Sequence, residues 1–109
     1  MTNRELLELA AKAAGMNVEW ESQYGVAELF DNDAHREWNP LTDDGDALRL
    51  AVKLEIELSS AYDAGMNAYA GYSIDDDMKY IIEPTGADPY AATRRAIVRA
   101  AAEIGKKIP

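Results

Sequence analysis

Residues 87–107 constrain the fold most, because they carry the signals of one long amphipathic helix. Asp88 is placed as its N-cap, and Pro89 follows at the first helical position, where proline is favoured. Gly105 is expected to end the helix, and the lysines after it suit the negative end of the helix dipole. The helical spacing of the apolar residues predicts a buried stripe of Tyr90, Ile97, Ala101 and Ile104.

Two further helices are predicted nearer the start of the chain. The first covers residues 3–14, where Thr2 and Glu5 have the spacing of a capping box. The second begins at Thr42 or Asp43 and runs for about three turns. Their apolar stripes are Leu6, Leu7, Leu9, Ala10, Ala13 and Ala14 in the first, and Ala47, Leu48, Ala51, Val52 and Leu54 in the second.

The segments between the helices have the marks of short strands. Residues 18–20 and 25–30 are expected to pair as a hairpin that turns at residues 21–23. Residues 78–83 alternate, with Met78, Tyr80 and Ile82 on one face, and two glycines weaken the preceding strand at residues 65–74. Residues 55–62 begin a strand or lengthen the second helix by a turn.

This element order, α-β-β-α-β-β-α, predicts an α+β fold. We expect one domain over residues 1–109, with a mainly antiparallel sheet sandwiched by helices in αβα layers. The longest apolar runs are a few residues, so no membrane span is expected. The absence of cysteine excludes disulfides and favours a cytoplasmic location.

The charge balance bears on the class of partner. The chain has 20 acidic and 11 basic residues and a formal net charge of −9. Such a charge repels nucleic acid and anionic lipid, so no direct nucleic-acid or membrane binding is expected. A basic partner is compatible with it, as is simple solubility. Since 48 % of the residues are hydrophobic, the charge does not imply disorder.

Two acidic runs are candidate partner-binding residues. Asp43, Asp44 and Asp46 lack the ligand spacing of a calcium-binding EF-hand loop, so they are interpreted mainly as helix-opening residues. The second run, residues 75–77, fits a hairpin turn. If both runs lay on one face, they would form an acidic contact surface. The second run consists of Asp75, Asp76 and Asp77.

Catalysis and cofactor binding have little support in the sequence. His35 is the only histidine, and no serine or cysteine nucleophile stands in a recognisable motif with it. One histidine without cysteine makes a poor transition-metal site. No phosphate-binding loop or dinucleotide fingerprint is present. We therefore expect no catalytic residues, no metal and no cofactor, and an enzyme that uses His35 with a carboxylate is the weaker alternative.

Two further groups of residues are candidate binding sites. Arg94, Arg95 and Arg99 form a short basic stripe that either pairs with acidic residues of the chain or grips a phosphate of a small ligand or nucleotide. Tyr69 and Tyr72 belong to a tyrosine-rich region that also contains Tyr62 and Tyr80. Such amphipathic aromatics are favoured at interfaces, which makes a partner contact or a homo-oligomer contact through this hairpin a hypothesis.

Three segments carry a family resemblance: residues 1–15, residues 38–54 and residues 88–105. In these helical blocks, about half of the chain, the sequence resembles the phage ABA sandwich domain family of small phage and prophage proteins. The resemblance implies a layered α-β-α sandwich, a phage or prophage genome and action in the bacterial cytoplasm. It brings no catalytic residues to this chain.

Together these features favour a non-enzymatic accessory protein of a phage or prophage that acts by binding. In its most concrete form, an acidic surface inhibits a basic host protein, as a mimic of nucleic acid or as an anti-defence protein. The alternatives are a nucleotide-binding module that uses the arginine stripe and a structural homo-oligomer.

Overall fold

The computed structural model describes the backbone of residues 1–109 and all side chains except those of Gln23, Ala61 and Tyr62. Helices and strands alternate along the chain, and the predicted α+β class is confirmed. In chain order the elements are α1 (Asn3–Ala13), β1 (Val18–Gln23), β2 (Val26–Asp31), β3 (Arg36–Glu37), α2 (Asp44–Lys53), β4 (Glu57–Tyr62), β5 (Asn67–Ile74), β6 (Asp77–Pro84) and α3 (Pro89–Lys106).

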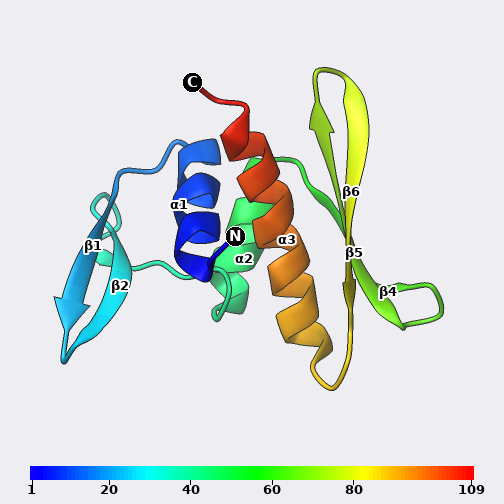
Figure 1. Cartoon of the computed structure of the whole chain (residues 1–109), viewed down its shortest axis with the longest axis horizontal. Coiled ribbons are helices and arrows are strands. Elements are labelled where there is room, and N and C mark those ends of the chain that lie inside the picture. Colours follow the sequence, from blue (N-terminus) through cyan, green and yellow to red (C-terminus); the bar gives the residue numbers. More distant parts are fainter.

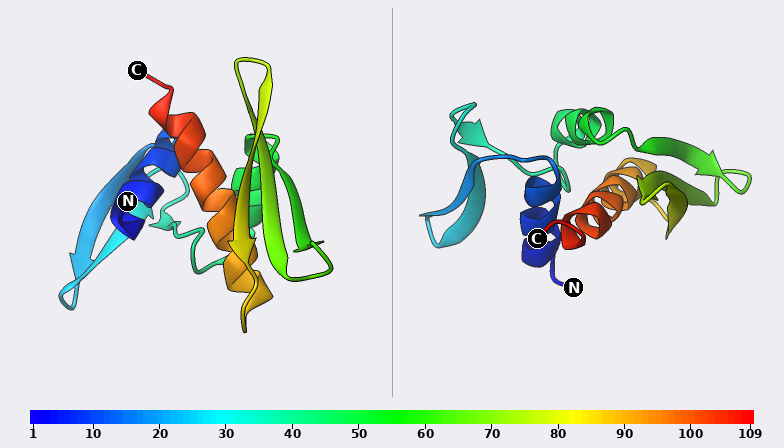
Figure 2. Two further views of the ribbon diagram at one scale, coloured as in Figure 1. Left: turned by 45° about the vertical axis from the view of Figure 1, so that its right-hand side comes forward. Right: turned by 90° about the horizontal axis from the view of Figure 1, so that it is seen from above.

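The strands form two separate sheets, ordered β1-β2-β3 and β4-β5-β6, and all their pairings are antiparallel. The layer order therefore differs from the expected αβα sandwich, because α1 and α3 stand between the two sheets (Figure 1; Figure 2, view from above). The antiparallel pairing itself is as predicted. Local signals specify each hairpin, but whether two hairpins join into one sheet depends on which elements pack between them, here α1 and α3.

The helix starts follow the predicted capping chemistry. At α1, the Glu5 amide donates to Thr2 Oγ1 and the Thr2 amide donates back to the Glu5 carboxylate, each at 3.1 Å. Hydrogen bonding from Thr2 holds the pKa of the Glu5 carboxyl below its ordinary value, with the bond from the Thr2 backbone amide as the largest cause. Asp43, rather than Thr42, caps α2, and Asp88 accepts from two amides at the start of α3.

The end of α3 differs from the prediction. The helix continues through Gly105 to Lys106. Gly105 is buried against α1, and a Cβ atom at this position would overlap the carbonyl oxygen of Leu9. The glycine therefore permits close approach of two helices, a requirement that the local sequence does not reveal.

The β1–β2 and β5–β6 hairpins close through two-residue turns in the left-handed region. Tyr24 and Gly25, with φ of 53° and 80°, form the first turn, so β1 is longer and the turn later than predicted. Asp75 and Asp76, with φ of 53° and 67°, form the second, and Asp77 already pairs in β6. Two consecutive positive φ values match the right-handed twist of the paired strands.

The core is built around α3 and is rich in alanine. This helix packs against α1 and against one face of the second sheet (Figure 1). Small side chains let these elements approach closely, and the side chains with the least exposure include Ala10, Ala68, Ala70, Ala96, Val98, Ala100, Ala101 and Ala102. In the described part of the chain, no helix has the length and apolar character needed to cross a membrane.

Candidate functional site

The first acidic run holds the start of α2 in place. Asp43 caps the helix by accepting the Asp46 amide at 2.8 Å. Asp44 is exposed and forms an ion pair of 2.6 Å with Arg94 of α3. The cap at Asp43 is the one that the helix-opening interpretation predicts, whereas the ion pair of Asp44 with α3 is a tertiary contact.

Asp46 is the most engaged member of this run and is only 2 % exposed. Its carboxylate accepts the Asn39 amide at 3.0 Å. The same carboxylate lies 2.8 Å from Arg49 and 3.2 Å from Arg36. A carboxylate buried behind these three donors is a structural anchor, and it is not accessible as part of an acidic contact surface.

The second acidic run lies far from the first. Asp75 and Asp76 form the tip of the β5–β6 hairpin, and all three aspartates of the run are exposed. The hairpin spans seven pairing steps between this tip and Pro84, beside which α3 begins. At a rise of about 3.3 Å per residue, the tip is about 23 Å from the other end of the hairpin, near which α3 starts. The start of α2 lies beside the start of α3, so the first acidic run is far from the tip and the two runs do not make one face (Figure 1).

The arginine stripe is paired within the protein. Arg94 donates to the Leu41 carbonyl at 2.9 Å in addition to its ion pair with Asp44. Arg95 and Arg99 both reach Glu83 of β6. Of the two alternatives for this stripe, the structure contains the pairing with acidic residues of the chain. A phosphate ligand would have to compete with these carboxylates.

The candidate tyrosines lie on opposite faces of the second sheet. Tyr69 points away from the helices and stacks on Tyr80, with ring centroids 5.2 Å apart. Tyr72 points toward α3 and is 7 % exposed. The two side chains therefore cannot share one contact surface, and Tyr62 lies outside the described side chains. Burial, the largest cause in each case, raises the pKa of both Tyr69 and Tyr72.

His35 lies in the exposed turn before β3, with φ of 58°. Its backbone amide donates to the Asp31 carbonyl at 2.9 Å. Among the described residues, no group of three or more His, Cys, Asp or Glu side chains is arranged to hold a metal ion.

An acidic surface does exist, on the outer side of the first sheet. Strand register places four glutamates around Phe30 on the side that faces away from the helices. Glu19 and Glu37 are the direct partners of Phe30 on the two flanking strands. We call this surface the glutamate face; it consists of Glu19, Glu21, Glu28, Glu37 and Phe30.

The electrostatics of the glutamate face are unfavourable within the free protein. Glu21 and Glu28 are direct cross-strand partners, and like charges in this position destabilise a sheet. Among the described side chains, no lysine, arginine or histidine forms an ion pair with any of the four glutamates. The opposite side of the same strands carries Val18, Trp20 and Leu29, which pack on the core.

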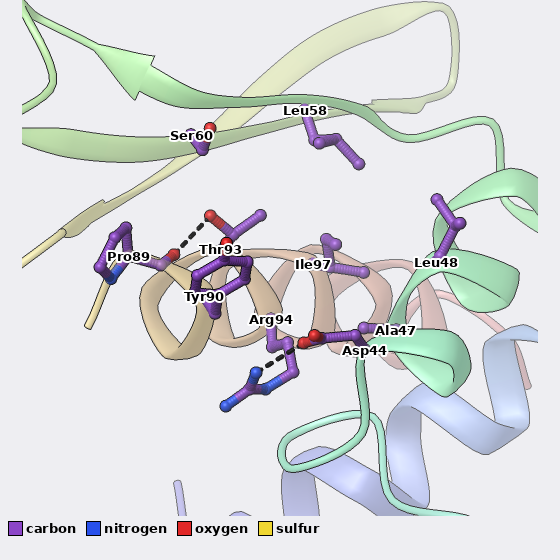
Figure 3. A pocket seen from close by; sticks show the side chains of 10 residues that line it. All are labelled: Asp44, Ala47, Leu48, Leu58, Ser60, Pro89, Tyr90, Thr93, Arg94 and Ile97. Atoms are coloured by element: carbon purple, nitrogen blue, oxygen red, sulfur yellow. Dashed lines mark hydrogen bonds and ion pairs between the residues drawn. The ribbon is translucent and has the colours of Figure 1, made fainter.

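A groove runs between α2, α3 and β4. Its volume is about 460 Å³, within the range of ligand-binding clefts. Leu58 of β4, Leu48 of α2 and Ile97 of α3 point into it from three sides (Figure 3). The Arg94–Asp44 ion pair lies at its α2–α3 side, so the groove is apolar with one polar margin.

Sequence reasoning missed both the groove and the glutamate face. Leu48 and Val52 were expected in the buried stripe of α2, but they are 59 % and 71 % exposed. Helical spacing predicts a stripe without showing how much of it is covered. For the glutamate face, the alternation of Glu19 and Glu21 with Val18 and Trp20 was visible in the sequence. The register that adds Glu28 and Glu37 was not.

No protein-family model, curated protein or solved structure matches this chain. The assignment of a function therefore rests on the geometry of these surfaces and on the resemblance of the helical segments.

Proposed function

We propose that this protein is a non-enzymatic binding protein that holds a basic surface of another protein against its glutamate face. The observation that carries the proposal is the clustering of four glutamates around Phe30 on the outer side of the first sheet, where no cation among the described side chains pairs with them. The net charge of −9 attracts a basic partner over the whole molecule, and this face gives the attraction a location.

The composition of the face is that of a contact surface with an aromatic centre. Phe30 is half-buried and lies between Glu19 and Glu37, and exposed Val26 lies on the same side of β2 beyond Glu28. Interfaces commonly combine an aromatic centre with a polar rim. A lysine or arginine side chain of a partner would also relieve the repulsion between Glu21 and Glu28, because its positive charge would attract both carboxylates.

The setting that we propose is the one suggested by the phage-family resemblance. The protein would be a phage or prophage accessory protein that acts on a basic host protein in the bacterial cytoplasm. If that host protein normally binds nucleic acid, the row of carboxylates would take the place of phosphates. Double-stranded DNA added to the captured complex should then release the partner, whereas a partner that stays bound would contradict the mimic form of the proposal.

Two triple variants test the location of binding. In one, Glu19→Gln, Glu21→Gln and Glu28→Gln remove three charges from the glutamate face. In the other, Asp75→Asn, Asp76→Asn and Asp77→Asn remove three charges from the β5–β6 tip, which keeps the total charge change equal. The measurement is capture of proteins from bacterial lysate at low and high salt.

We expect the wild type and the aspartate variant to retain a basic partner at low salt, and the glutamate variant to lose it. High salt should release the partner, because the Debye length falls to about 3 Å at 1 M salt. Equal loss in both variants would show that only bulk charge matters. Retention in both would remove the glutamate face from the proposal.

A further inference from the structure

Helix α2 exposes apolar residues beside the second sheet. Leu48 and Val52 lie one turn apart and are among the most exposed large apolar side chains of the described chain. Helix α3 covers β5 and β6, whereas α2 stands beside β4 and makes few contacts with the sheet (Figure 2, view from above). The apolar side chains Leu48 and Val52 of α2 are thus left uncovered by the described part of the chain, beside the second sheet.

Strand β4 is one of the two edges of that sheet, the one next to α2. One side of its backbone pairs with β5, and the other side has no strand beside it within the chain. An edge of this kind is a ready template for pairing with another chain. On the helix-facing side of β4, Leu58 is 42 % exposed and lines the apolar groove with Leu48 and Ile97 (Figure 3).

We propose that an extended segment of a partner protein adds to the edge of β4 as a fourth strand of the second sheet. Its backbone pairs with β4, and every second side chain enters the groove and covers Leu48 and Leu58. Strand addition of this kind draws affinity from main-chain hydrogen bonds and specificity from pockets for alternate side chains. The proposal goes beyond the glutamate face, because it uses the other sheet.

Charge complementarity identifies the chemistry of this segment. Glu57 lies on the outer side of β4 and exposed Glu55 precedes it, whereas Asp44 at the polar margin of the groove is already paired with Arg94. Opposite charges on directly opposed residues of adjacent strands are stabilising. The segment therefore alternates apolar residues, which face the groove, with lysine or arginine, which face outward beside Glu57.

The same charges argue against a second copy of this chain as the occupant. Two β4 edges in antiparallel pairing would bring Glu57 of each copy to the same outer face. Each copy also carries a net charge of −9, so the association would be repulsive in the long range. A basic segment from another protein has neither cost.

The test uses a synthetic peptide of alternating lysine and valine, with blocked ends and a fluorescent label. A control peptide of the same composition carries its valines and lysines in two separate blocks. Binding is measured by fluorescence polarisation, and amide chemical shifts of the isotope-labelled full chain locate it. We expect the alternating peptide to bind at least about tenfold more tightly than the block peptide, a difference of about 1.4 kcal/mol, and to shift amides of β4 and α2.

Variants separate groove binding from attraction by charge. Leu48→Gln removes an exposed apolar side chain without a change of charge and should weaken the alternating peptide at least about tenfold. Met78→Gln is the matched control, because Met78 is half-exposed on the outer face of the same sheet. It should leave the affinity within about twofold of the wild type.

The Glu19→Gln, Glu21→Gln, Glu28→Gln variant should also bind the alternating peptide as the wild type does. A loss in this variant with no effect of Leu48→Gln would place the peptide on the glutamate face and overturn the strand-addition proposal. Equal binding of the two peptides, or no shift of β4 and α2 amides at millimolar peptide, would overturn it as well. Sedimentation that shows self-association sensitive to Leu48→Gln would assign the edge to a second copy instead.

Discussion

The backbone of Gly105 in α3 lies directly against the carbonyl group of Leu9 in α1. No side chain fits between the two helices at this point, because even a Cβ atom on Gly105 would overlap the Leu9 carbonyl oxygen. The contact fixes how closely the last helix approaches the first, and α3 in turn carries the packing of the second sheet.

Gly105→Ala should therefore destabilise the protein, although alanine is the better helix former by about 1 kcal/mol. The collision involves backbone that cannot move aside cheaply, so we expect a net loss of about 2 kcal/mol in urea unfolding. Gly45→Ala is the control, because its Cβ would meet only side-chain atoms, of Arg49 at 3.1 Å and of Asp43 at 3.2 Å, and no backbone. Its loss of stability should be clearly smaller than that of Gly105→Ala, and an equal loss in both variants would contradict the role of Gly105.

Asp46→Ala should cost about 3 kcal/mol of unfolding free energy, since it removes a buried charge that pairs with two arginines. The variant also leaves the Asn39 amide without its acceptor. In the control Asp44→Ala, the lost ion pair joins Arg94 to a side chain that is 68 % exposed, so the expected cost is below about 1 kcal/mol. Similar costs for the two aspartates in chemical denaturation would show that Asp46 is no anchor.

Tyr72 should make the fold sensitive to alkaline pH. Burial, and then the nearby Glu103 charge, raises the pKa of Tyr72 above its ordinary value of 10.0. The folded state thus favours the neutral phenol. Its contribution to stability is complete below the unfolded pKa and is lost as the pH rises through the higher folded pKa. Tyr72→Phe should lose less stability than the wild type between neutral pH and strongly alkaline pH. Parallel pH profiles of thermal unfolding would count against this assignment.

Glu28→Lys should stabilise the first hairpin, because it replaces a like-charge pair with Glu21 by an attractive one. The expected gain is about 0.5 kcal/mol in urea unfolding at low salt. The same change should weaken capture of the basic partner. Together the two results would show that the Glu21–Glu28 pair lowers the stability of the fold and raises the affinity for the partner. Glu55→Lys changes the charge equally outside the glutamate face and serves as the control. A stability gain in that variant as large as in Glu28→Lys would point to net charge alone.

The starts of all three helices were predictable, because capping joins residues no more than three positions apart. Thr2, Asp43 and Asp88 each satisfy amides of the turn that they precede. The Asp75–Asp76 turn was predictable for the same reason, since short-range backbone preferences decide it. In the first acidic run this local chemistry explains the cap at Asp43. Asp44 pairs with Arg94 and Asp46 with Arg36, both of which lie outside α2.

The locations of the candidate sites depended on contacts between distant residues. Sequence spacing grouped Leu48 and Val52 with the buried residues of α2, but the position of α3 against the sheet left them exposed beside β4. Strand register brought Glu28 and Glu37 to the face that Glu19 and Glu21 share. By itself the sequence determined the elements, the acidity and the local caps. Only the tertiary structure decided which faces are covered, because burial depends on which distant segments meet.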